Sequence, residues 1–109
     1  MIVISDTSPI TALLTIGQIE ILRALYGTVK IPPAVNEELR AWHVDIPDFI
    51  QMVPVQTDLL LNELQRTLDR GEAEAIVLAK HLKADLLLIE HFNLNYSRMR
   101  QTSRGHLLR

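Results

Sequence analysis

MIVISDTSP, residues 1–9, is the stretch that decides the fold. Residues 2–4 form a short β-branched apolar run, and residues 6–9 are typical of a strand end followed by the start of a helix. Asp6 is therefore expected at the carboxyl end of a strand, which is where ligands bind in open α/β sheets. A second interpretation is that Asp6 or Ser8 only caps the following helix.

The composition is that of an ordinary globular protein. The chain has 109 residues, of which 48% are apolar and 22% are charged, so a single domain is expected. It has no cysteine, which excludes disulfides and thiolate metal sites. No apolar run approaches the roughly 20 residues that a membrane span needs, and the N-terminus carries no basic leader. We therefore expect a cytoplasmic protein without membrane contact.

The charge is distributed unevenly along the chain. Four of the 11 Lys and Arg residues lie in residues 91–109, which contain no acid, so residues 1–90 hold seven basic residues against 13 acidic ones. An acidic body is poorly suited to binding nucleic acid by charge alone, unless divalent cations neutralise part of it.

The remaining pattern alternates strands with helices. We expect a helical turn over 9–15, a helix over 19–26, a strand over 28–31, a helix over 33–42, an edge strand within 49–55, a helix from 58, an alanine-rich helix over 71–82 and a strand over 86–89. The last strand is a continuous apolar run, as in strands buried on both faces of a parallel sheet. This alternation predicts an α/β fold with a central parallel sheet.

One acid lies on an apolar helix face. Val35, Leu39 and Trp42 share a face at helical spacing, and Glu38 lies on that face, whereas Glu37 projects towards solvent. Burying a carboxylate there is costly unless it is paired or bound to metal. The alternative is that Glu38 sits at the rim and stays hydrated.

Further acids mark the alanine-rich helix and the last strand. Glu72 and Glu74 lie about 200° apart on the helix, so only one of them can point into a given site. Glu72 continues into Ala75, Ile76 and Ala79, all apolar, and is the better inward candidate, whereas the face of Glu74 runs to a histidine. Acids in a first helical turn, however, also offset the helix dipole without any function. Glu90 directly follows the last strand, so two strands end in a carboxylate.

Together, the acids indicate a metal site. Asp6, Glu38, Glu72 or Glu74, and Glu90 supply hard oxygen ligands, which suit Mg²⁺ or Mn²⁺ rather than zinc. Such ions activate water and stabilise the charge of a phosphodiester during in-line displacement. Glycine-rich phosphate loops and a nucleophile elbow are absent from the sequence, and the histidines are scattered. Hydrolysis of nucleic acid is the reaction class that these residues favour.

Four stretches, in this order, resemble the PIN-domain superfamily, and specifically its small prokaryotic VapC-like branch: MIVISDTSPI, IPPAVNEEL, LDRGEAEAIVLA and KADLLLIE. The resemblance covers residues 1–90. It implies a three-layer α/β/α sandwich around a parallel sheet, with acidic residues that bind Mg²⁺ or Mn²⁺ and cut single-stranded RNA. In toxin–antitoxin members of the family, a small cognate antitoxin protein blocks this site.

The resemblance also implies which residues form the site. The expected catalytic residues and metal ligands are Asp6, Glu38, Glu72 with Glu74 as its neighbour among the ligands, and Glu90. Ser8 matches a polar residue beside the first aspartate, and with Thr7 it is expected to support the ligands or to touch the substrate.

Two features depart from the family pattern. Glu90 stands where the family more often has aspartate. Residues 91–109 lack the apolar strand and the amphipathic helix that usually follow, so we expect a PIN-like domain over 1–90, a divergent basic tail over 91–109, and a sheet without its last strand and helix. An open sheet edge favours association, for example as a homodimer. Alternatively, the arginines of the tail contact RNA phosphate.

The sequence therefore yields two functional hypotheses. The first is a VapC-type, metal-dependent endoribonuclease that forms the toxin of a toxin–antitoxin pair. The second is a truncated, catalytically impaired PIN remnant that binds protein or nucleic acid without cutting RNA.

Overall fold

The computed structural model describes residues 1–89, so the predictions for Glu90, for residues 91–109 and for a missing last strand and helix lie outside the described residues. Within residues 1–89, four strands form one sheet: β1 (Val3–Ser5), β2 (Val29–Ile31), β3 (Ile50–Met52) and β4 (Leu86–Leu88). Their order is β3-β2-β1-β4, and each neighbouring pair is parallel. The predicted α/β class with a parallel sheet is confirmed.

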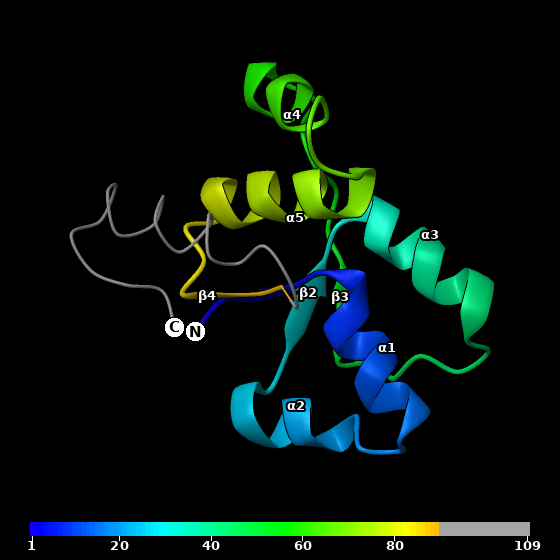
Figure 1. The fold of residues 1–109 in the computed structure, drawn as a ribbon. Coiled ribbons are helices and arrows are strands. Elements are labelled where there is room, and N and C mark those ends of the chain that lie inside the picture. The colour runs from blue at the N-terminus through cyan, green and yellow to red at the C-terminus, as the bar shows by residue number, and fades with distance from the viewer. Residues whose placement is uncertain (90–109) are drawn as a thin grey trace.

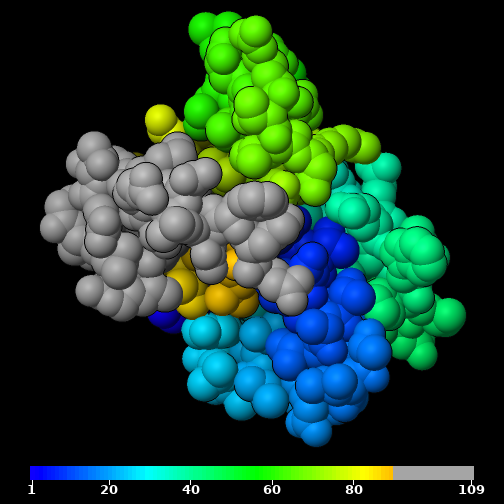
Figure 2. Space-filling view, viewed as in Figure 1, coloured from blue at the N-terminus to red at the C-terminus, as the bar shows by residue number. Residues whose placement is uncertain are grey.

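Helices cover the sheet on both faces: α1 (Thr7–Thr15), α2 (Glu20–Tyr26), α3 (Pro33–Trp42), α4 (Leu59–Leu64) and α5 (Arg70–His81). The central helix α5 packs on β1 and β4, and α2 packs on β2 from the other side of the sheet (Figure 1). The short helix α4 lies outside α5, and with the turn that follows it forms a protrusion (Figure 2). This arrangement is a three-layer α/β/α sandwich.

The strand order changes direction at β1, because strands are added first on one side of β1 and then on the other. The chain first builds β1, β2 and β3 outwards, and it then returns through α4 and α5 to add β4 on the other side of β1. Ser5 pairs with Leu88, and the Asp6 N–H donates to the Leu88 carbonyl at 2.9 Å. Ligands of open α/β sheets bind at such switch points, at the carboxyl ends of the strands. Asp6 occupies this position.

Burial follows from the two helical layers. All three residues of β1 are buried, as expected for a central strand covered on both faces. Residues 71–79 of α5 are all buried as well. Ala75 and Ala79 belong to the main core with the strands, and their small side chains let α5 pack closely on the sheet. Ala73 lies on another face of the helix, in a cluster with Leu61 of α4.

The structure corrects two details. Helix α1 begins at Thr7 and not at Pro9, because proline is tolerated in a first helical turn, where its missing N–H breaks no hydrogen bond. Trp42, predicted on the buried face of α3, is 81% exposed. The buried residues of α3 are Ala34, Val35 and Leu39, so the burial of this helix ends before its last turn. The predicted edge strand is confirmed as β3.

The part of the chain that the structure describes contains no candidate membrane-spanning helix. Each helix within residues 1–89 is too short or too polar to cross a bilayer.

The burial of α3 generates a stability prediction. Leu39→Ala removes a fully buried side chain and is expected to lower the free energy of unfolding by about 2–5 kcal/mol. Trp42→Ala, on the same helix, is expected to change it by less than about 0.5 kcal/mol because the indole is exposed. Urea denaturation of the full chain measures both. Equal losses in the two variants would contradict the observed face of α3.

Candidate metal centre

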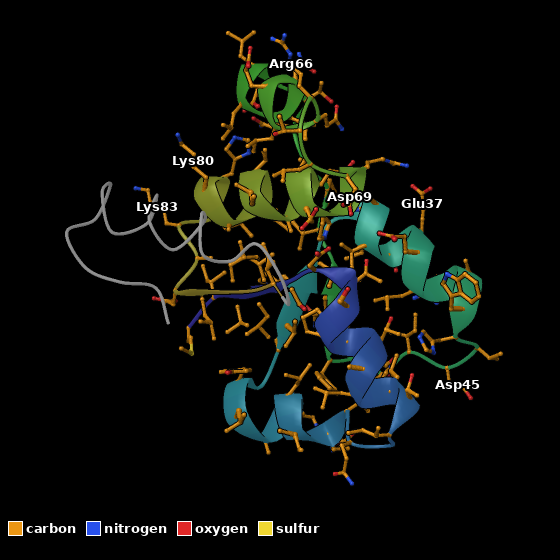
Figure 3. The ribbon with its side chains drawn as sticks, viewed as in Figure 1. Glu37, Asp45, Arg66, Asp69, Lys80 and Lys83 are labelled. Carbon is orange, nitrogen blue, oxygen red and sulfur yellow. The ribbon has the colours of Figure 1, made fainter. Side chains whose placement is uncertain are left out.

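Three helices begin at the carboxyl edge of the sheet. Asp6 occupies the N-cap position of α1, Pro33 opens α3, and Asp69 occupies the N-cap position of α5. The first turns of α3 and α5 lie close together, with the side chains of Glu37 and Asp69 near this junction (Figure 3). Because helix N-termini carry partial positive charge, they favour the anionic groups collected here.

Asp6 is the most perturbed acid of this edge. Its side chain makes no capping hydrogen bond although it stands at an N-cap position, and the residue is 5% exposed. Burial raises the pKa of Asp6 to about 6, the N–H of Thr7 opposes the shift, and the carboxylates of Asp69, Glu72 and Glu38 raise it further. A buried acid that does not cap its helix and is surrounded by other acids is a functional-site candidate.

Gly71 leaves open the space between three carboxylates. A Cβ atom at this position would lie 2.7 Å from Glu38 Oε1, 3.3 Å from Asp6 Oδ1 and 3.6 Å from Asp69 Oδ1. These oxygens come from α3, from the end of β1 and from the start of α5, so residues distant in sequence converge on one point. We call the space between these three carboxylates, those of Asp6, Glu38 and Asp69, the cradle. The side chain of any larger residue at position 71 would enter it.

Asp69 belongs to the cluster but was not among the predicted site residues. Its Oδ1 accepts a hydrogen bond from the N–H of Glu72 at 2.8 Å, which caps α5 and fixes the carboxylate. In the sequence, the Asp-Arg-Gly stretch at residues 69–71 indicates only a turn. The available signal was its place at the start of a helix that has to return to the acidic edge of the sheet.

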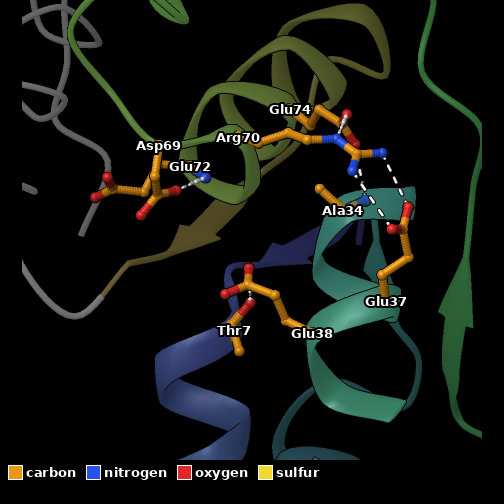
Figure 4. A network of polar contacts seen from close by, with 8 residues as sticks. All are labelled: Thr7, Ala34, Glu37, Glu38, Asp69, Arg70, Glu72 and Glu74. Carbon is orange, nitrogen blue, oxygen red and sulfur yellow. Dashed lines mark hydrogen bonds and ion pairs between the residues drawn. The ribbon is translucent and has the colours of Figure 1, made fainter. Parts of the chain in front are cut away.

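Glu38 lies at the rim of the cluster. The residue is exposed, and its Oε1 accepts a hydrogen bond from Thr7 Oγ1 at 2.9 Å (Figure 4). Thr7 therefore orients one of the converging oxygens. Ser8 is half-buried in the first turn of α1, and its hydroxyl has no hydrogen bond within residues 1–89.

Glu72 and Glu74 are both buried, but they interact with different neighbours. Glu72 is 5% exposed and acts electrostatically on Asp6. Glu74 is 7% exposed and accepts hydrogen bonds from the N–H of Ala34 at 2.9 Å and from Arg70 Nε at 3.1 Å (Figure 4). The structure thus brings Asp6, Glu38 and Glu72 together, while both oxygens of Glu74 are engaged elsewhere.

Glu74 caps α3 from another helix. The N-cap residue of α3 is Pro32 and the first helical residue is Pro33, so neither supplies a side-chain oxygen to the free N–H groups of the helix. Glu74 Oε1 satisfies one of them, that of Ala34. The contact joins the starts of α3 and α5, the two helices that deliver Glu38 and Asp69.

A pocket of about 280 Å³ adjoins the cluster. Its lining comes from the starts of α3 and α5: Ala34, Glu37, Glu38, Asp69, Arg70 and Gly71. Two of the three oxygens around Gly71 therefore belong to residues that face an open cavity. The site is accessible from solvent on this side.

The donor chemistry fits a hard divalent cation. Within residues 1–89, no three side chains of the ligating types already stand in a coordinating arrangement. Mg²⁺, however, usually keeps several waters and takes one or two carboxylates directly. Carboxylate oxygens around a point that only glycine leaves open fit such a partly hydrated ion. The pKa of Asp6 is raised mainly by burial and further by the neighbouring carboxylates, and a bound cation would offset the repulsion from those carboxylates.

Comparison with known families gives one match. Residues 2–94 match the family described as PIN domain. No curated protein and no solved structure matches the chain.

The pKa of Asp6 generates a pH-dependent prediction for the metal-free protein. Because this pKa is raised from 3.8 to about 6, the folded state holds the proton more tightly, so ionised Asp6 costs stability. The cost is absent below about pH 4, grows as the pH rises, and is complete above about pH 6. In EDTA, Asp6→Asn should therefore be more stable than the wild type at about pH 8, by up to about 3 kcal/mol.

Urea denaturation across this pH range measures the difference. It should shrink towards zero at about pH 4. A difference that does not change with pH, or a wild type that is the more stable protein at about pH 8, would contradict the burial of Asp6 among like charges.

The capping contact generates a second prediction. Glu74→Ala leaves the buried N–H of Ala34 without its acceptor and should lower the free energy of unfolding by about 1–3 kcal/mol. Glu74→Gln keeps an acceptor oxygen and should cost less. Glu20→Ala, which removes an exposed ion pair with Arg23, serves as the control and should change stability by at most about 1 kcal/mol. Thermal melts would refute the capping role if Glu74→Ala behaved like the control.

Proposed function

Because the chain belongs to the PIN-domain family, we propose that it is a Mg²⁺- or Mn²⁺-dependent endoribonuclease that cuts single-stranded RNA. Membership of this family indicates a nuclease-type function. The observation that carries the proposal is the convergence of the oxygens of Asp6, Glu38 and Asp69 around Gly71 at the switch point of the sheet. The pocket beside them offers access to a polymeric substrate.

The proposed ion-holding residues are Asp6, Glu38, Asp69 and Glu72, joined by Glu90 on the evidence of the sequence. A divalent cation held here supplies Lewis acidity to a phosphodiester and lowers the pKa of a water. Glu74 is assigned to the structure and not to the ion, since Ala34 and Arg70 engage its two oxygens.

The chain's own residues orient these donors. Thr7 fixes one oxygen of Glu38 by a hydrogen bond, and the N–H of Glu72 fixes Oδ1 of Asp69. Asp6 is buried and held on the end of β1 by the bond of its N–H to β4, so its carboxylate has little freedom. Donors fixed in this way lose little entropy when they bind an ion or a substrate.

The finer parts of the proposal rest on the VapC-like motifs of the sequence. They are that the chain is the toxin of a toxin–antitoxin pair and that a small cognate antitoxin protein covers its site. The proposed homodimer rests instead on the sheet edge that the divergent tail is expected to leave open. The site at the carboxyl edge is open through its pocket, so a partner protein that fills this pocket would block access for RNA.

Cleavage of single-stranded RNA tests the activity. The wild type is expected to cut a labelled RNA with Mg²⁺ or Mn²⁺ and not in EDTA, and Asp6→Asn should lower kcat at least about 100-fold. Glu63→Gln removes a carboxylate from an exposed ion pair outside the site and should leave the rate unchanged. Cleavage that survives Asp6→Asn would sink the assignment, and RNA binding without cleavage would favour the catalytically impaired remnant.

Gly71→Ala tests the cradle separately from folding. The new Cβ would lie 2.7 Å from Glu38 Oε1 and would displace it. The nearest atom is the end of an exposed glutamate side chain, which can move aside, so the variant is expected to fold. Calorimetric titration with Mn²⁺ should show at least about tenfold weaker binding. Unchanged Mn²⁺ affinity would remove Gly71 from the site.

A further inference from the structure

Among the residues that the structure describes, Arg70 is the one cation that lines the acidic pocket. Of the six residues that line this cavity in the described part of the chain, three are acids and only Arg70 is basic. Its position is set by the helix start, because it directly follows the N-cap residue Asp69 and precedes Gly71 of the cradle. A guanidinium is thus placed beside the carboxylates around Gly71.

The two ends of the guanidinium have different partners. At one end, Nε donates to Glu74 Oε2 at 3.1 Å. At the other end, Nη1 and Nη2 donate to the two oxygens of Glu37 at 3.4 Å and 2.9 Å (Figure 4). Both glutamates raise the pKa of Arg70, so its charge is secure.

The two glutamates differ in how easily another anion can replace them on the guanidinium of Arg70. The side chain of Glu74 is 9% exposed and also caps α3, which makes it a fixed anchor. The side chain of Glu37 is 62% exposed, and an ion pair between exposed side chains contributes little net stability because water and salt screen it. A competing anion can therefore take the place of Glu37 while Glu74 keeps the guanidinium in position.

We propose that Arg70 binds a phosphate of the RNA strand beside the acidic centre, with this phosphate replacing Glu37 on the guanidinium. The fork of Nη1 and Nη2 matches phosphate oxygens as it matches the carboxylate of Glu37. This inference rests on the proposed ribonuclease function, because it names the group that holds the substrate of that same site.

The charge of the pocket supports this role. The acids around Gly71 repel a polyanion, and the carboxylate of Glu37 adds to this repulsion while it occupies the arginine. A fixed cation at this edge favours RNA binding, and Arg70 supplies one from α5. Glu37 then acts as a competitor that weakens RNA binding.

An exposed ion pair elsewhere on the chain provides matched controls. Arg66 and Glu63 lie 3.6 Å apart, with side chains 74% and 70% exposed, and neither lines the pocket. Arg66 lies beside α4, away from Glu37 (Figure 3). Arg66→Gln and Glu63→Gln therefore make the same charge changes as Arg70→Gln and Glu37→Gln without touching the pocket.

The experiment measures RNA cleavage kinetics of the full chain with Mg²⁺ and the anisotropy of a labelled single-stranded RNA. The anisotropy is measured in an Asp6→Asn background to prevent cutting. Arg70→Gln should raise KM and Kd about tenfold and change kcat less than about threefold. Glu37→Gln should lower KM and Kd about threefold. Both control variants should stay within about twofold of the wild type.

A double variant tests whether Glu37 acts through Arg70. In an Arg70→Gln background, Glu37→Gln should give no further gain in RNA affinity. If Arg70→Gln does not fold, Glu37→Gln still decides the matter, because it leaves the bond between Arg70 and Glu74 in place.

The outcomes separate this inference from the function on which it rests. An active wild type whose Arg70 and Glu37 variants match their controls would overturn the phosphate contact and leave the nuclease proposal standing. A wild type that neither binds nor cuts RNA would overturn both. A loss in kcat alone at Arg70→Gln would also contradict a substrate-binding role.

Discussion

The burial of Asp6 at the carboxyl end of β1 is the constraint on which the site depends. A carboxylate with 5% exposure at the switch point of a parallel sheet is unfavourable by itself, and neighbouring acids increase the cost, as its pKa of about 6 shows. The burial of Asp6 lowers the stability of the fold, and it places an acidic centre on rigid elements of the structure. Titratable groups with strongly shifted pKa values cluster at functional sites.

The elements around Asp6 reduce the cost without removing the negative charge. The starts of α1, α3 and α5 meet at this edge, and their N–H groups favour anions. Two contacts join the starts of α3 and α5: the N–H of Ala34 donates to Glu74, and Arg70 donates to Glu37. They hold together the two helices whose first turns lie beside Glu38 and Asp69. One acid is thereby used for structure, and this leaves the others to face the cradle at Gly71.

Much of the fold was predictable because its periodicities are strong. Helix α3 was predicted with its observed bounds since two prolines open it and the apolar spacing runs through it. The position of Asp6 at the carboxyl end of β1 is predictable because a β-branched run ends there. The apolar continuation of its helix face favours Glu72 over Glu74 as the inward acid, and the structure buries both. Trp42 was misplaced, since helical spacing gives a face but not the point at which the neighbouring layers end.

Asp69 was missed because an N-cap aspartate serves any helix and carries no sign of its tertiary neighbours. The role of Glu74 was equally hidden, as capping of α3 by a residue of α5 is a contact between positions 40 residues apart. The approach of Gly71 to Glu38 and Asp6 is likewise a product of packing between layers. Local patterns indicate which residue types are available, and the crossing of α5 over the sheet decides which of them meet.

The central claim is that these carboxylates form one divalent-cation site around Gly71. Anomalous X-ray scattering from a crystal of the full chain grown with Mn²⁺ tests it most directly. The account predicts an anomalous peak between Asp6, Glu38 and Asp69, beside Gly71. A crystal with Mn²⁺ bound only elsewhere, or with these carboxylates ordered and no peak between them, would contradict it.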